Sequence, residues 1–128
     1  MIKKNIIYVI PLLFLLAIFG FQSISALGTE EITTSELGDL LDQPNDYFFV
    51  DVREVHEYNE AHINGMVNVP LSTLNSDYHN IPKDRTAVIF CRSGNRSLQA
   101  IKILEDLGYE NLINVKGGML AWEGEVVN

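Results

Sequence analysis

The sequence predicts an α/β fold, with a mostly parallel sheet of about five strands and helices on both faces. After residue 30, short apolar runs that suit buried strands alternate with stretches that suit helices. Polar motifs follow three of these apolar runs, and ligands of parallel sheets bind beyond the carboxyl ends of the strands. With 128 residues, the chain has room for one domain of ordinary size.

The first 26 residues are not expected to belong to that domain. Two lysines precede an uncharged apolar run over 6–21, and small residues follow it. This order is typical of a secretory signal, and the run is close to the roughly 20 residues that span a bilayer. We therefore expect residues 1–26 to be a cleaved signal peptide or a retained membrane anchor. Residues 27–128 would then form a domain exported to the periplasm or the extracytoplasmic face of a bacterial-type membrane, with membrane contact through 1–26 alone.

The charge and the cysteine content narrow the function classes. The chain has 17 acidic and 9 basic residues, and two of the basic ones lie within 1–26. The exported part thus carries seven basic against 17 acidic residues, a net charge of about −10, which disfavours nucleic acid as a partner. A single cysteine, Cys91, forms no internal disulfide, so its thiol is available for chemistry.

The expected domain begins with a short strand over 31–33. Thr33 and Glu36 have the spacing of a capping box, which predicts a helix over 35–41. The order strand, helix, strand continues along the rest of the chain.

Residues 47–52 are hydrophobic enough for a strand that is covered on both faces. Such a strand delivers Asp51 and Arg53 to its carboxyl end. The other expected elements are a short helix over 54–59, a strand over 66–69, a helical turn over 71–77, strands over 87–90 and 112–115, a helix from Ser97 to a cap at Gly108, and a last helix over 119–123.

The cysteine lies between the apolar run 86–90 and the helix that begins near Ser97. Backbone N–H groups at a helix start lack partners and can point at a bound anion. Arg92 and Arg96 add positive charge, so we expect a lowered thiol pKa and an anion pocket. The predicted site comprises Cys91 as the nucleophile and Arg92, Ser93, Gly94, Asn95, Arg96 and Ser97 as binding residues.

Three ordered motifs carry a resemblance to a known family. They are Cys91–Ser97, the stretch from Asp51 through His62 to Pro70, and Gly117–Trp122. Together they resemble the motifs of single-domain rhodaneses, sulfurtransferases that carry sulfur as a cysteine persulfide. The resemblance covers about residue 30 to the C-terminus and implies a rhodanese-like fold. It departs from the family at Ala61, where glycine is usual.

The resemblance implies that a Cys91 thiolate takes the outer sulfur of a small anionic donor such as thiosulfate. The persulfide then passes its sulfur to a thiol or to cyanide. This chemistry needs no metal or organic cofactor, and the three histidines lack the spacing of metal ligands.

The neighbouring residues are expected to support the loop. Asp51 is expected to hydrogen-bond the loop or pair with an arginine, and Arg53 to pair with Glu57. Ser97 is expected to cap the following helix, and Trp122 to be a core aromatic residue.

Two other function classes stay open. A phosphatase or arsenate reductase of related architecture uses a Cys-x5-Arg loop, but here the arginine, Arg96, comes one position early. A carrier or docking module would hold sulfur on Cys91 with little turnover, and the sequence does not separate this class from the enzyme.

Overall fold

The computed structural model describes residues 28–128, so the predicted signal peptide or anchor over 1–26 lies outside the described residues. Five strands form one sheet in the order β1-β5-β4-β2-β3, and every pair is parallel. The strands are β1 (Glu30–Ile32), β2 (Tyr47–Asp51), β3 (Val67–Asn68), β4 (Thr86–Phe90) and β5 (Leu112–Val115). The α/β fold that the sequence predicts is confirmed.

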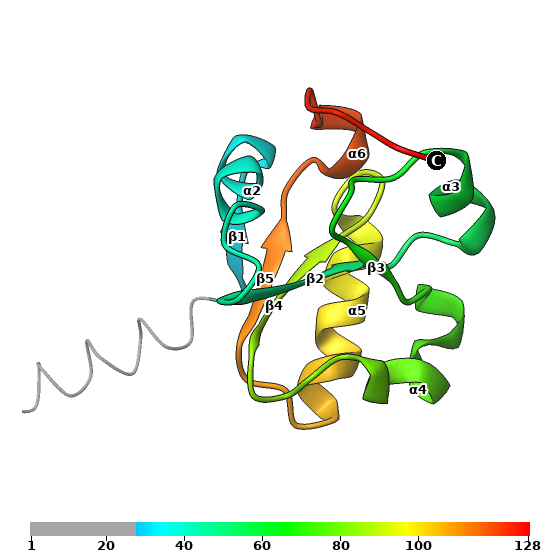
Figure 1. Ribbon diagram of the computed structural model, residues 1–128. Helices are drawn as coiled ribbons and strands as arrows, with labels where there is room; N and C mark the ends of the chain where they lie inside the picture. The colour runs from blue at the N-terminus through cyan, green and yellow to red at the C-terminus, as the bar shows by residue number, and fades with distance from the viewer. Residues whose placement is uncertain (1–27) are drawn as a thin grey trace, which may run out of the picture.

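Helices cover both faces of the sheet (Figure 1). On one face, α4 and α5 bury Leu74, Ile101 and Leu104 against the central strands. On the other, α2 and α6 contribute Leu37 and Met119 to a second apolar cluster. The helices are α2 (Thr34–Leu40), α3 (Val55–Glu60), α4 (Leu74–Asp77), α5 (Asn95–Asp106) and α6 (Gly118–Ala121), with 3-10 turns at Leu71–Thr73 and Tyr78–Asn80. None of the helices within 28–128 is both long and apolar enough to cross a bilayer.

The central strands are apolar on both sides because each side meets a helical layer. Within β4, Val88 faces one cluster and Ile89 the other, and both are fully buried. At the start of α2, Thr33 and Glu36 form the predicted capping box, with 3.1 Å between Thr33 Oγ1 and the Glu36 N–H. Gly108 follows α5 at φ +94°, as expected for a helix-ending glycine.

Most element boundaries differ from the predictions by one or two residues. The largest difference near the site is α5, which begins at Asn95 and not at Ser97. Gly94 has φ +105°, a left-handed conformation that glycine adopts without strain, and it turns the chain directly from the loop into the helix. The loop that carries the cysteine is therefore tighter than the sequence suggested.

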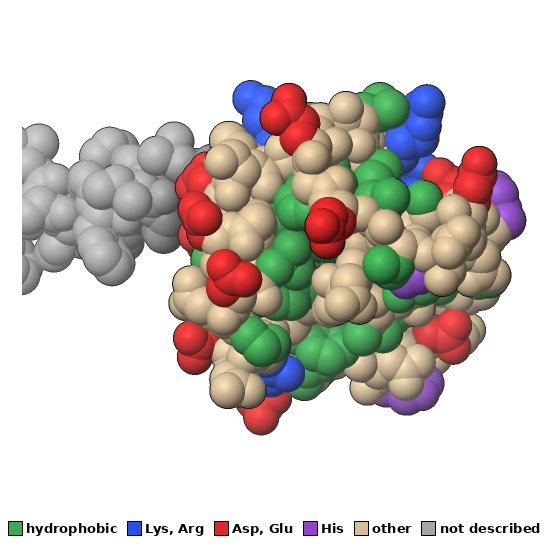
Figure 2. All heavy atoms as spheres, turned by 45° about the horizontal axis from the view of Figure 1, so that its top comes forward, with side chains coloured by type: hydrophobic (Ala, Val, Ile, Leu, Met, Phe, Trp, Pro, Cys, Tyr) green, Lys and Arg blue, Asp and Glu red, His purple; other side chains and the backbone are tan. Residues whose placement is uncertain are grey.

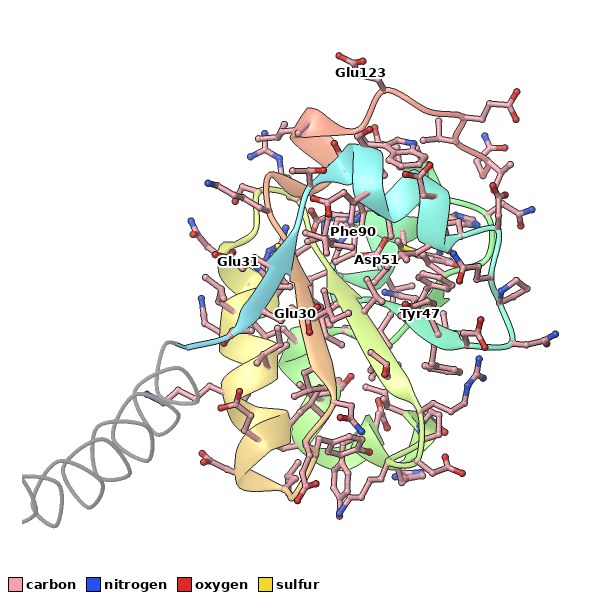
Figure 3. All side chains as sticks on the ribbon, turned by 90° about the vertical axis from the view of Figure 1, so that its left-hand side faces the viewer. Glu30, Glu31, Tyr47, Asp51, Phe90 and Glu123 are labelled. Atoms are coloured by element: carbon pink, nitrogen blue, oxygen red, sulfur yellow. The ribbon has the colours of Figure 1, made fainter. Side chains whose placement is uncertain are left out.

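The carboxyl ends of the strands meet at one edge of the sheet. Asp51 of β2 lies opposite Phe90 of β4 in the parallel register, and Figure 3 shows both at the same end, away from Tyr47. The chain leaves β5 at this end toward α6 (Figure 1). The three polar motifs converge at this edge.

Candidate active site

Cys91 follows the last residue of β4 and lies at the base of the loop that leads into α5. Its side chain is fully buried. The Gly94 N–H donates to Cys91 Sγ at 3.1 Å, and Ser97 Oγ lies 3.3 Å from Sγ. The sulfur thus sits inside a ring of loop amides and one hydroxyl, a geometry that suits a negative charge.

The pKa of the Cys91 thiol is lowered. Burial raises it, and this is the largest single effect, but the Ser97 hydroxyl and the backbone N–H groups of Ser97, Gly94 and Ser93 together outweigh burial. We expected Arg92 and Arg96 to be the main cause; the hydroxyl and the amides contribute more. The thiolate is stabilised by hydrogen bonds made inside the loop.

Arg96 is held by Glu57 of α3. Two short contacts join them, from Arg96 Nη1 to Glu57 Oε1 at 2.6 Å and from Nη2 to Oε2 at 2.9 Å. The hydrogen bonds from Arg96 lower the pKa of the Glu57 carboxyl to about 2, against its ordinary 4.5. The carboxylate therefore stays charged at neutral pH, and the guanidinium fork faces it.

The predicted pair between Arg53 and Glu57 is wrong. Arg53 pairs with Asp51, with 2.8 Å between Arg53 Nη2 and Asp51 Oδ2, and it meets Glu57 only at the backbone carbonyl oxygen. The Arg53 N–H also donates to Asp51 Oδ1, so the turn after β2 brings the guanidinium back onto the nearer carboxylate. Both side chains are buried, and the Asn68 amide bonds the carbonyl oxygens of both residues. The supporting role expected of Asp51 agrees with this arrangement.

Ser97 does not cap α5, contrary to the prediction. The capping position is Gly94, and Ser97 lies buried inside the first turn. Its hydroxyl donates to the Gly94 carbonyl oxygen at 2.9 Å and lies against Cys91 Sγ. The early start of the helix moves Ser97 from the cap to the thiol.

The Gly117-Gly118 turn grips the loop from the other side. The Met119 N–H donates to the Cys91 carbonyl oxygen at 2.9 Å, and the Leu120 N–H donates to the Arg92 carbonyl oxygen at 3.0 Å. A Cβ atom on Gly118 would collide with the Cys91 carbonyl oxygen and the Arg92 carbonyl group. These two α6 amides were not among the predicted site residues; the paired glycines were the one sequence signal for them.

The other predicted residues lie on the outer side of the loop. Arg92, Ser93 and Asn95 are exposed. Arg92 borders a shallow depression that Glu57 and Leu120 also line. Trp122 is partly buried against the apolar cluster of α2 and α6, in line with a core role. Within residues 28–128, no group of three or more His, Cys, Asp or Glu side chains is arranged to hold a metal ion.

Comparisons with known proteins agree with this geometry. Residues 33–125 match the family model described as "Rhodanese-like domain". The chain is 35% identical over 96 residues to the putative sulfurtransferase YtwF of Bacillus subtilis, covering 75% of this chain and 92% of that protein. It is 32% identical over 104 residues to the putative sulfur carrier protein YrkF of the same organism, covering 81% of this chain and 56% of that one.

The solved structures include a similar fold. A rhodanese-like domain protein from Staphylococcus aureus superposes with a TM-score of 0.69 at 32% identity, covering 76% of this chain and 94% of that chain. Some relatives are much longer. The chain spans 24% of the length of two probable adenylyltransferase/sulfurtransferase proteins of Mycobacterium tuberculosis that it matches.

Proposed function

Because the chain belongs to the rhodanese-like domain family, we propose that it is a sulfurtransferase that carries sulfane sulfur as a persulfide on Cys91. The observation that carries this proposal is the position of Cys91 Sγ, 3.1 Å from the Gly94 N–H and 3.3 Å from Ser97 Oγ. Groups that stabilise a thiolate there would also stabilise the charged outer sulfur of a persulfide.

The first proposed step forms the persulfide. The Cys91 thiolate attacks the outer sulfur of thiosulfate, the donor's S–S bond breaks, and sulfite leaves as a dianion with the electron pair. The product is the Cys91 persulfide anion, which the loop amides of Ser93, Gly94 and Ser97 are placed to hold. The burial of the thiol favours a donor that presents one narrow sulfur atom.

The second proposed step passes the sulfur on. A thiolate or cyanide attacks the outer sulfur of the persulfide, and the Cys91 thiolate is the leaving group. Its lowered pKa makes it a good leaving group as well as a nucleophile that is ionised near neutral pH. Neither step needs a metal or an organic cofactor.

The carrier class remains a second candidate, because a relative at 32% identity is named as a putative sulfur carrier. The phosphatase class has less support, since Arg96 is bound to Glu57 and does not turn its guanidinium into the loop. Four residues separate Cys91 from Arg96, and this spacing leaves little room for a tetrahedral phosphoryl group.

The test is sulfur uptake followed by transfer. Intact-protein mass after treatment with thiosulfate should show one added sulfur atom that a reducing agent removes, and thiocyanate should form when cyanide is added. Cys91→Ser should lose both signals while it keeps the fold, because a hydroxyl is similar in size but not ionised. Thiocyanate formation by Cys91→Ser would refute the mechanism. Sulfur uptake without turnover would favour the carrier, and Cys91-dependent hydrolysis of an aryl phosphate would favour the phosphatase.

We also propose that residues 1–26 direct the domain across a membrane. The support is the order of two lysines, an apolar run and small residues. Cell fractionation with intact-protein mass would distinguish a cleaved signal from a retained anchor, and full-length protein in the cytoplasmic fraction would contradict export.

A further inference from the structure

The charges around the thiol are balanced. Arg53 faces Asp51 at 2.8 Å and Arg96 faces Glu57 at 2.6 Å, so each of these arginines has its own carboxylate. Arg92 is exposed and forms no salt bridge within the part of the chain described here. A pocket that attracts a small dianion needs unpaired positive charge, and this loop has one exposed cation.

The surface beside the loop is acidic. Glu57 and Glu60 line the depression together with Arg53 and Arg92, so its own charges cancel, while the Arg53 charge is already matched by Asp51. Figure 2 brings the end of the molecule with α3 and α6 toward the viewer, and acidic side chains lie across it. An anion that approaches Cys91 crosses a surface of its own sign.

Glu57 has the central place in this arrangement. It occupies the guanidinium fork of Arg96 with both carboxylate oxygens, and its side chain is 21% exposed at the depression. Its carboxyl pKa of about 2 keeps it charged at every pH at which the thiolate reacts. It therefore cancels the cation that a Cys-x4-Arg loop would otherwise offer to an anion.

We propose that Glu57 determines donor specificity, disfavouring small multiply charged anions at Cys91 and favouring the persulfide of a thiol, R–S–SH, as the sulfur donor. This inference rests on the proposed sulfur transfer and names its donor class. Thiosulfate remains a usable laboratory donor, but it reacts against the charge of Glu57.

The favoured reaction balances without an oxidant. The Cys91 thiolate attacks the outer sulfur of R–S–SH, a new S–S bond forms, and the donor's S–S bond breaks. R–S⁻ leaves with the electron pair, and the proton stays on the outer sulfur, which gives Cys91–S–SH. One negative charge enters and one leaves at the thiol. With thiosulfate, by contrast, a dianion must approach the thiolate and a dianion must depart, so repulsion from Glu57 counts twice per unit charge.

The first test uses alkylation and needs no sulfur transfer. Rates of Cys91 alkylation are measured with iodoacetamide, which is neutral, and iodoacetate, which is an anion, and are corrected by the rates of free cysteine. In the unaltered protein, the iodoacetate-to-iodoacetamide ratio should rise with added NaCl, because salt screens repulsion. A ratio that falls with salt would mean attraction and would overturn the inference.

The second test changes the carboxylate. Glu57→Gln should raise the iodoacetate-to-iodoacetamide ratio about three- to tenfold at low salt. Glu105→Gln removes the same charge from the far end of α5 and should leave the ratio unchanged. An unchanged ratio in Glu57→Gln would overturn the inference.

The third test compares donors. Glu57→Gln should raise the kcat/KM ratio of thiosulfate to an alkyl persulfide by a similar factor. If the alkylation ratio changes as expected but the donor ratio does not, the donor assignment is overturned although sulfur transfer stands. If neither donor loads Cys91 in the unaltered protein, the proposed function fails, and the donor assignment fails with it.

Discussion

Replacing Ser97 by alanine tests the origin of the lowered thiol pKa. Ser97 Oγ lies 3.3 Å from Cys91 Sγ, and its hydrogen bond is the largest of the effects that lower this pKa. The hydroxyl donates to the Gly94 carbonyl oxygen at 2.9 Å as drawn. Since it has one proton, it must turn from that carbonyl to the sulfur when the thiolate forms.

The structure sets the size of the effect. A hydrogen bond to a charged group contributes about 1.5 kcal/mol at the lower end of its range, and about 1.4 kcal/mol corresponds to a factor of ten. The amides of Ser93, Gly94 and residue 97 itself remain in Ser97→Ala, so the thiolate keeps its other donors. We expect a roughly tenfold lower thiolate population wherever the pH lies below the thiol pKa.

The assay is the pH dependence of iodoacetamide alkylation. The rate of Ser97→Ala should be about tenfold lower on the acid limb and unchanged on the alkaline plateau, so the whole profile moves to higher pH. Ser93→Ala is the matched control, because the Ser93 side chain is exposed and makes no hydrogen bond within residues 28–128. Superimposable profiles for Ser97→Ala and the unaltered protein would show that the amides alone set the pKa.

Three further changes test the framework around the loop. Gly118→Ala should lower the free energy of unfolding by about 2–4 kcal/mol in a denaturant titration, because the new Cβ meets the Cys91 and Arg92 carbonyl groups. Gly38→Ala, inside α2 with its nearest neighbour 3.9 Å away, should raise it by about 0.5–1 kcal/mol, and equal effects would contradict the reasoning. Asp51→Ala should cost about 3–5 kcal/mol, since it strands the buried Arg53 charge, and a cost under about 1 kcal/mol would show that this pair is not structural. The Glu57 carboxyl pKa is lowered from 4.5 to about 2, so the stability it contributes is complete above about pH 4.5 and is lost as the pH falls toward 2. Partial exposure reduces this to about 1–2 kcal/mol; Glu57→Gln should flatten the acid limb of a plot of stability against pH, and an unchanged limb would place the titrating group elsewhere.

The strands and the site edge could be predicted because apolar runs and motif positions are local properties of the sequence. The runs at 47–52, 87–90 and 112–115 lie within one residue of β2, β4 and β5. Parallel pairing then brings Asp51, Cys91 and the Gly117-Gly118 turn to one edge with no knowledge of side-chain contacts. The capping box at Thr33 is local in the same way.

The helix start could not be placed because it depends on one backbone angle. The seven residues Cys91–Ser97 are all polar or small, and no apolar period marks where the helix begins. Gly94 at φ +105° settles the point by ending the loop after four residues. The two-residue shift has a chemical consequence, since it takes Ser97 off the cap and places its hydroxyl on the sulfur.

The choice of ion partners was beyond the sequence for a different reason. Arg53 has carboxylates two and four positions away, at Asp51 and Glu57, and spacing alone favours neither. Arg96 stands 39 residues from Glu57, and only the packing of α3 beside the loop brings the two together. Once Asp51 takes Arg53 in the turn after β2, Glu57 is left to take Arg96. A local turn at the end of β2 thereby decides whether the arginine of the loop is free to attract an anion, and it leaves the hydrogen bonds of the loop as the main support of the thiolate.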